Sequence, residues 1–231
     1  MIKPDIETIV NEFKSQSNPD DRYSSFDYCY NYFRTSGDLS QDIEKSCLAL
    51  GFYLASWGML RGSSFLLQKS AKHFEPTIRY IAALDKSVWY IDVDKYDDKN
   101  IKTIIKIYSD IRSLLIINNN SDLTLVTKVL LGIFGFIPAF DNYFCNSFRE
   151  ISGGQCGFRK VNEKSLLHIR RFYESNKNAI DKLSAETFTK DFLTGQDTTV
   201  NYPKAKIIDM YGFTAGLKKQ QSNQKMIIPD K

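Results

Sequence analysis

The sequence predicts an all-α fold, a single multi-helix domain around a buried central helix at about 41–67. The run from Cys47 to Leu60 carries no charge and has a helical period, which is typical of a helix surrounded by other helices. Amphipathic helical patterns recur along the chain, whereas strand-like alternation occurs only briefly, at 88–94. A membrane span needs about 20 apolar residues. The uncharged run is shorter, so we expect it in a protein core.

The central helix has two kinds of face. Bulky side chains of Leu50, Tyr53, Leu54 and Trp57 occupy one face, which we expect to fill the core. Small residues that would let a second backbone approach closely form the neighbouring stripe: Cys47, Gly51, Ala55, Gly58 and Gly62.

The elements before and after this helix follow from periodicity and end signals. Ser40 is a candidate N-cap for the central helix, and Gly37 ends the aromatic-rich helix before it. Strand-like residues 88–94 have no evident partner, so we expect an extended connection there. The remaining helices are predicted at about 4–14, 20–36, 75–84, 100–115, 123–134, 139–151, from Asn162 onward, and from Pro203 onward.

The domain is expected to cover 1–217, with two lobes at about 1–117 and 118–217 as an alternative. Residues 218–231 lack periodicity and are expected to form a mobile tail. The net charge of +4 is unevenly placed: residues 1–100 sum to −3 and residues 101–231 to +7. A basic second half is a hint of an anionic partner, but the charge alone favours the alternative, a solvated surface with a mild bias.

Several classes of site are absent from the sequence. No phosphate-binding Gly-Lys-Ser/Thr loop or dinucleotide fingerprint occurs, so no cofactor is predicted. The four cysteines lack metal-ligand spacing, so we expect no metal and interpret them as free thiols. The start of the sequence lacks a secretory signal pattern, and no membrane partner is predicted, so a cytoplasmic location is expected.

Two blocks, GFYLASWGMLRGSSFLLQ and LLGIFGFIPAFDNYF, resemble uncharacterised bacterial all-α proteins. That resemblance implies an α-helical fold and a bacterial, cytoplasmic origin. It implies no activity.

The turn Ile133–Pro138 is similar to the hairpin of helix-hairpin-helix DNA glycosylases. The resemblance implies phosphate binding at the turn, at Gly135, and a catalytic lysine or aspartate nearby, for which Lys128 and Asp141 are the candidates. The second glycine of such hairpins is absent, because Ile137 stands in its place. The alternative is that Lys128 lies on a solvated strip and that Asp141 caps the following helix.

Arg61 directly follows the uncharged run, and its wheel position lies between Leu50 and Leu54. We expect it to be at least half-buried, with an internal partner such as Asp141 or with a bound anion.

The leading hypothesis is therefore a nucleic-acid-binding helical protein, with DNA-glycosylase-like catalysis as its sharper form. The sequence leaves open whether the protein is an enzyme. The main alternative is a non-enzymatic subunit of a bacterial assembly that binds a protein partner, and a small-molecule-binding domain is a third. The predicted nucleic-acid contacts are Arg61, Gly135, Arg159, Lys160, Lys164, Arg170, Arg171 and Lys177. In the helix after Asn162, Lys164, His168 and Arg171 are expected to share the outer face.

Overall fold

The computed structural model describes residues 5–15, 17–117 and 122–227. Ten α-helices and one two-stranded sheet form in these ranges, which confirms the all-α prediction. The helices are α1 (Ile6–Ser15), α2 (Ser25–Thr35), α3 (Ile43–Ser56), α4 (Glu75–Ala82), α5 (Asp98–Leu115), α6 (Leu123–Phe134), α7 (Asn142–Ile151), α8 (Glu163–Ser175), α9 (Lys177–Glu186) and α10 (Lys204–Ile227). The strands are β1 (Phe188–Lys190) and β2 (Asp197–Asn201), paired antiparallel.

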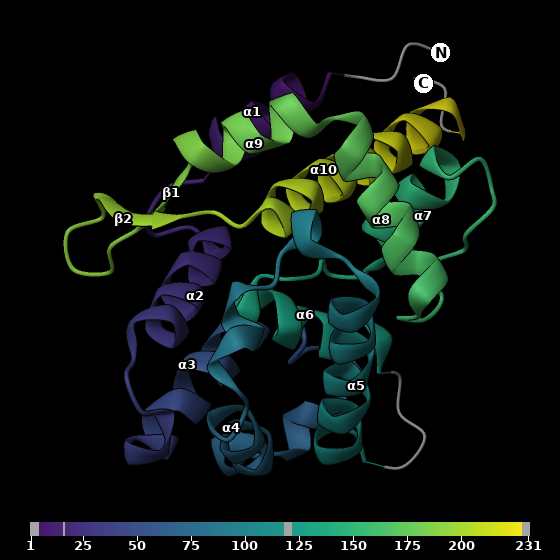
Figure 1. Cartoon of the computed structure of the whole chain (residues 1–231). Helices are drawn as coiled ribbons and strands as arrows, with labels where there is room; N and C mark the ends of the chain where they lie inside the picture. The colour runs from purple at the N-terminus through teal and green to yellow at the C-terminus, as the bar shows by residue number, and fades with distance from the viewer. Residues whose placement is uncertain (1–4, 16, 118–121, 228–231) are drawn as a thin grey trace.

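The helices form two groups in space. Helices α2 to α6 lie together in the lower part of Figure 1, and α1 lies with α7 to α10 in the upper part. The first helix thus packs on α9 and α10, from the other end of the chain, while α6 packs on α2, α3 and α5. A boundary at 117/118 therefore does not separate two packing units.

The helix that is buried on every side is α6, not the one predicted at about 41–67. All of residues 125–134 are buried. In α3, by contrast, the side chains of Leu48 and Phe52 are 54 % and 69 % exposed. This helix is also shorter than predicted: it ends at Ser56, and Gly58 then takes a left-handed conformation (φ +76°) that turns the chain away. The apolar pattern identified a helix but not which of its faces would find a partner.

Three other segments differ from the sequence prediction. Residues 88–94 contribute to two short 3₁₀ turns, Lys86–Tyr90 and Val93–Lys95, rather than an extended connection. The region around 194–201, expected as a loop, contains β2. Residues 218–227, expected as a tail, continue α10, and the rest of that predicted tail lies outside the described residues.

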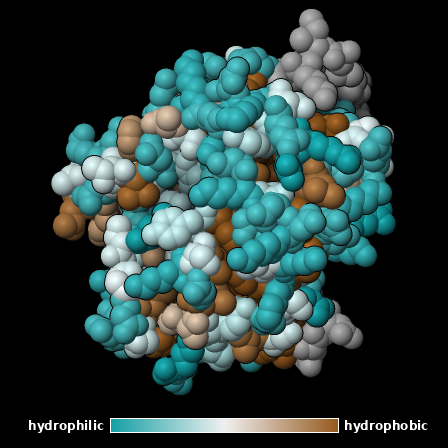
Figure 2. Space-filling model, viewed as in Figure 1, coloured by the Kyte–Doolittle hydropathy of each residue, from teal (hydrophilic) through white to brown (hydrophobic). Residues whose placement is uncertain are grey.

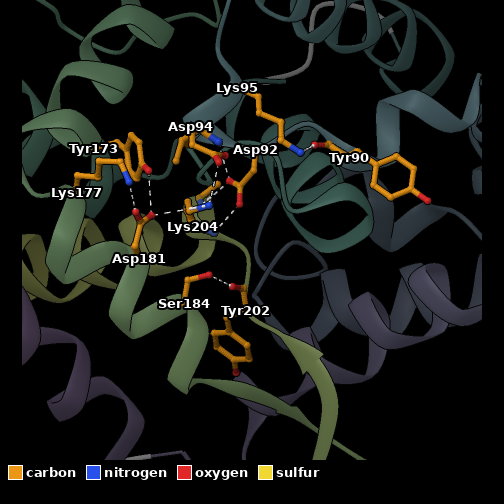
Figure 3. A network of polar contacts seen from close by, with 12 residues as sticks. Tyr90, Asp92, Asp94, Lys95, Tyr173, Lys177, Asp181, Ser184, Tyr202 and Lys204 are labelled. Atoms are coloured by element: carbon orange, nitrogen blue, oxygen red, sulfur yellow. Dashed lines mark hydrogen bonds and ion pairs between the residues drawn. The ribbon is translucent and has the colours of Figure 1, made fainter.

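The start of α10 is held by a polar network drawn in Figure 3. The Asp92 carboxylate accepts hydrogen bonds from the backbone amides of Lys204 (2.7 Å) and Ala205 (3.0 Å), two donors that a helix N-terminus leaves without an intrahelical partner. The Lys204 ammonium in turn lies 3.0 Å from a carboxylate oxygen of Asp94 and 3.8 Å from one of Asp181. A residue more than 100 positions earlier in the sequence therefore caps this helix.

The face of the molecule shown in Figure 2 is mainly hydrophilic, and hydrophobic residues appear on it in several places among the hydrophilic ones. Among the helices described, none has both the length and the apolar character needed to cross a membrane.

Candidate functional site

A group of buried charged side chains lies where α6 and α10 meet the end of α3. Lys206 and Asp209 of α10 form an ion pair of 2.9 Å, with side chains only 1 % and 5 % exposed. The Lys206 ammonium also lies 4.5 Å from the centre of the Trp57 ring. Lys128 of α6 lies 4.8 Å from the same ring, so two cations contact one indole.

Lys128 is buried, not on the solvated strip that was the alternative prediction. Its side chain is 4 % exposed, and its ammonium donates a hydrogen bond of 3.2 Å to the carbonyl of Trp57. Burial lowers the pKa of Lys128 below its ordinary value, while the negative charges of Asp141 and Asp209 oppose that shift. The amine is therefore easier to deprotonate than that of a surface lysine.

Asp141 lies within electrostatic range of Lys128, without a direct ion pair between them in the described part of the chain. Its carboxylate caps α7 by accepting a hydrogen bond of 2.9 Å from the amide of Phe144, so the capping alternative is correct. Burial raises the pKa of this carboxyl, and the charge of Lys128 counteracts the rise. The two candidate catalytic residues are thus brought together.

The turn after α6 does not present the predicted phosphate contact. Gly135 is buried in a left-handed conformation (φ +69°), and a Cβ there would lie 2.5 Å from Pro203 and 2.8 Å from the ring of Tyr30. Neighbouring amides are also used inside the protein: Ala139 donates to Asp209 and Phe140 donates to Thr127. The prediction of a nucleic-acid contact at Gly135 is therefore wrong for this conformation, because packing covers the turn.

Arg61 is exposed, against the prediction that it would be at least half-buried. The chain leaves the helical path before this position, so the wheel position on which the prediction depended does not apply. Its guanidinium instead lies against Gly58, since a Cβ added there would meet it at 2.9 Å.

The remaining predicted cations divide into two sets. Arg170 pairs with Glu174 at 2.7 Å, and Lys177 pairs with Asp181, so both charges are neutralised locally. By contrast, four exposed cations on α8 and the loop before it make no ion pair with any described residue: Arg159, Lys160, Lys164 and Arg171. Arg149, at the end of α7, is a further exposed cation of this kind that the sequence analysis missed.

The α8 cations border a groove. A depression of about 550 Å³ is lined by Gln155, Lys164, His168 and Arg171, together with Glu163 and Leu167. Lys164, His168 and Arg171 thus share one face, as their spacing predicted. Burial, together with the positive charges of Arg171 and Lys164, lowers the pKa of His168 below its ordinary value. Gln155 lies in an irregular loop, where no periodic signal pointed to it.

Comparisons of the chain with protein-family models, with curated proteins and with solved structures find no match. The described residues contain no group of histidine, cysteine, aspartate and glutamate side chains that could hold a metal ion.

Proposed function

We propose that this protein binds nucleic acid, with phosphate contacts made by Arg159, Lys160, Lys164 and Arg171. The observation that supports this most directly is that these exposed cations lack acidic partners, whereas Arg170 and Lys177 on the same side of the molecule are paired. Unpaired cations gathered on one helix and its preceding loop attract a polyanion, and each phosphate contact releases counterions. Glu163, beside Lys164, reduces this field without cancelling it.

Fluorescence anisotropy with labelled DNA and RNA at two salt concentrations tests the proposal. Binding should weaken steeply with salt, and the variant Lys164→Ala/Arg171→Ala should reduce the slope of log K against log salt by about 1.4 to 1.8. The matched control is Lys45→Ala/Lys69→Ala, which removes the same charge from exposed positions in the other helix group. Absence of binding at low salt, or equal effects of the two variants, would overturn the proposal. That result would direct attention to apolar association through the exposed Leu48 and Phe52 of α3.

A base-excision activity is the sharper second candidate, favoured by the lowered pKa of Lys128 and the proximity of Asp141. A neutral Lys128 amine would condense with the aldehyde carbon of an abasic deoxyribose to give an imine and water. Because Lys128 is 4 % exposed, this reaction requires the segment at Trp57 to open. Borohydride would reduce the imine to a stable cross-link with the wild-type protein and not with Lys128→Met. Equal trapping in both would exclude Lys128.

A further inference from the structure

The groove beside α8 continues into a second, larger hollow. Gln155, His168 and Arg171 line both the depression that contains Lys164 and a neighbouring one of about 660 Å³. The larger hollow lies among α1, α7, α8 and α10, and aromatic side chains form its inner wall: Phe148, Phe158, Phe172 and Tyr211. A charged entrance therefore adjoins an apolar hollow whose volume is in the range of small-molecule sites.

The aromatic wall is fixed by its own packing. The rings of Phe148 and Phe172 lie 5.0 Å apart, and those of Phe172 and Tyr211 lie 5.2 Å apart. These side chains are each less than 9 % exposed, so packing already fixes the wall before any ligand arrives, and only a small part of the ring surface faces the hollow. A preformed wall costs little ordering entropy on binding.

Polar groups with unused hydrogen-bonding capacity stand at the rim. Within the described ranges, the side-chain amide of Gln155 and the imidazole of His168 make no hydrogen bond, and the Arg171 guanidinium makes neither a hydrogen bond nor an ion pair. Asn176 donates from its Nδ2 to the carbonyl of Phe172 at 2.8 Å, which leaves its carbonyl oxygen as an acceptor. Donors and acceptors beside an apolar wall match the requirements of a heterocyclic base.

Charge is distributed unequally along the groove. Lys164 lies at the end of the groove away from the larger hollow. Asp5, which directly precedes α1, lines the larger hollow itself. A phosphate is therefore attracted to Lys164, and to Arg171 where the two hollows adjoin, and is repelled from the Asp5 end. The base of a nucleotide carries no charge, so it can occupy the larger hollow beside Asp5 while its phosphate lies at the Lys164 end.

We propose that this groove binds single-stranded nucleic acid, with one unstacked base in the larger hollow and its flanking phosphates on Lys164 and Arg171. This inference rests on the nucleic-acid binding proposed above and deepens it by naming the strand state. A base paired within a duplex is stacked between its neighbours and cannot enter the hollow, whereas a single strand can turn a base outward.

The test compares three labelled probes of equal length: a single strand with bases, a single strand with abasic sugars throughout, and a duplex. Contacts between a base and aromatic side chains contribute about 1 to 3 kcal/mol per base. Because little of the surface of these rings is exposed, we expect the lower end of this range, so that the strand with bases binds about fivefold more tightly than the abasic strand. The variant Ser175→Leu fills the rim of the larger hollow without changing charge, and it should bring this ratio close to one while leaving abasic-strand affinity unchanged.

Asn178→Leu is the matched control, because it adds a similar apolar side chain at an exposed position nearby that does not line the hollow. Gln155→Ala is a second test variant, which removes a rim amide and should also lower the ratio. Equal affinity of the wild type for both single strands, or a ratio unchanged in Ser175→Leu and Gln155→Ala, would overturn the inference and leave phosphate binding intact. Failure of all three probes to bind at low salt would instead remove the proposed function itself.

Discussion

The ammonium of Lys206 lies 2.9 Å from a carboxylate oxygen of Asp209, one turn further along α10, and water reaches almost none of either side chain. The second oxygen of Asp209 accepts a hydrogen bond of 3.0 Å from the amide of Ala139. The same ammonium lies 4.6 Å from the ring centre of Phe26 in α2. This buried ion pair therefore joins α10 to α2 and to the turn after α6.

Removal of one member of the pair should cost more than removal of both. Asp209→Ala leaves the Lys206 cation buried without a counter-ion and the Ala139 amide without an acceptor, so the free energy of unfolding should fall by about 3 to 5 kcal/mol. Lys206→Met/Asp209→Asn keeps similar volume without the charges and should recover part of that loss. Urea denaturation of the wild type and the two variants measures both effects. A double variant no more stable than Asp209→Ala would contradict this account.

The stability contributed by Lys128 should depend on pH. Because its pKa is lower in the folded protein than its ordinary value near 10.5, the unfolded chain binds more protons between the two values. Stability should therefore rise with pH across that interval as the buried amine loses its proton. The free energy of unfolding of the wild type, measured at pH 7 and pH 10, should increase relative to that of Lys128→Met. An identical change in both proteins would show that Lys128 does not titrate differently on folding.

Asp27 should make the free energy of unfolding depend on pH in the opposite direction, and at lower pH than Lys128 does. Burial raises the pKa of this α2 carboxyl to about 6, although the Tyr202 hydroxyl, the Lys190 amide and the charge of Lys206 favour the ionised form. The folded state thus holds the proton more strongly than the unfolded chain between about pH 4 and pH 6, and stability should fall as pH rises through that window. Asp27→Asn should flatten this slope in thermal unfolding curves recorded from pH 4 to pH 7. A slope that persists unchanged would assign the titration to another group.

The α10 cap offers a comparison between two neighbouring aspartates. Asp92→Ala removes the acceptor for the amides of Lys204 and Ala205 and should lower the free energy of unfolding by about 1 to 3 kcal/mol. Hydrogen exchange at those two amides should accelerate. Asp94→Ala removes only a more exposed ion pair with Lys204 and should cost less than about 1 kcal/mol. Similar losses in both variants would argue that capping is not the main contribution of Asp92.

Hydrophobic periodicity was sufficient to predict a helix and its exposed face where one face of the helix contacts solvent and the other the core. The helix at about 100–115, which forms as α5, and the Lys164, His168 and Arg171 face of α8 were predicted correctly, because the side chains on those helices divide between solvent and core. It failed where both sides of a helix are apolar. Neither the burial of α6 nor the exposure of Phe52 could be inferred locally, since each depends on helices distant in the sequence.

The candidate sites show the same limit. Lys128 and Asp141 were selected by their positions around a turn, but the burial of Lys128 depends on Trp57, more than 70 residues earlier in the chain. Gln155 and the aromatic wall of the larger hollow come from α7, α8, α10 and a loop with no periodicity. These residues come together only through tertiary packing, so no local sequence pattern could predict the hollow that they line.

The packing of α1 on α10 has a consequence for biosynthesis. The buried face of α1 (Ile6, Ile9, Val10 and Phe13) is translated long before the helix that covers much of it, which begins only at Lys204. Until the ribosome has released that segment, the nascent chain carries an uncovered apolar helix, which is a binding site for chaperones. The native packing of α1 is therefore expected only after α10 has emerged, in a step that joins two segments far apart in the sequence.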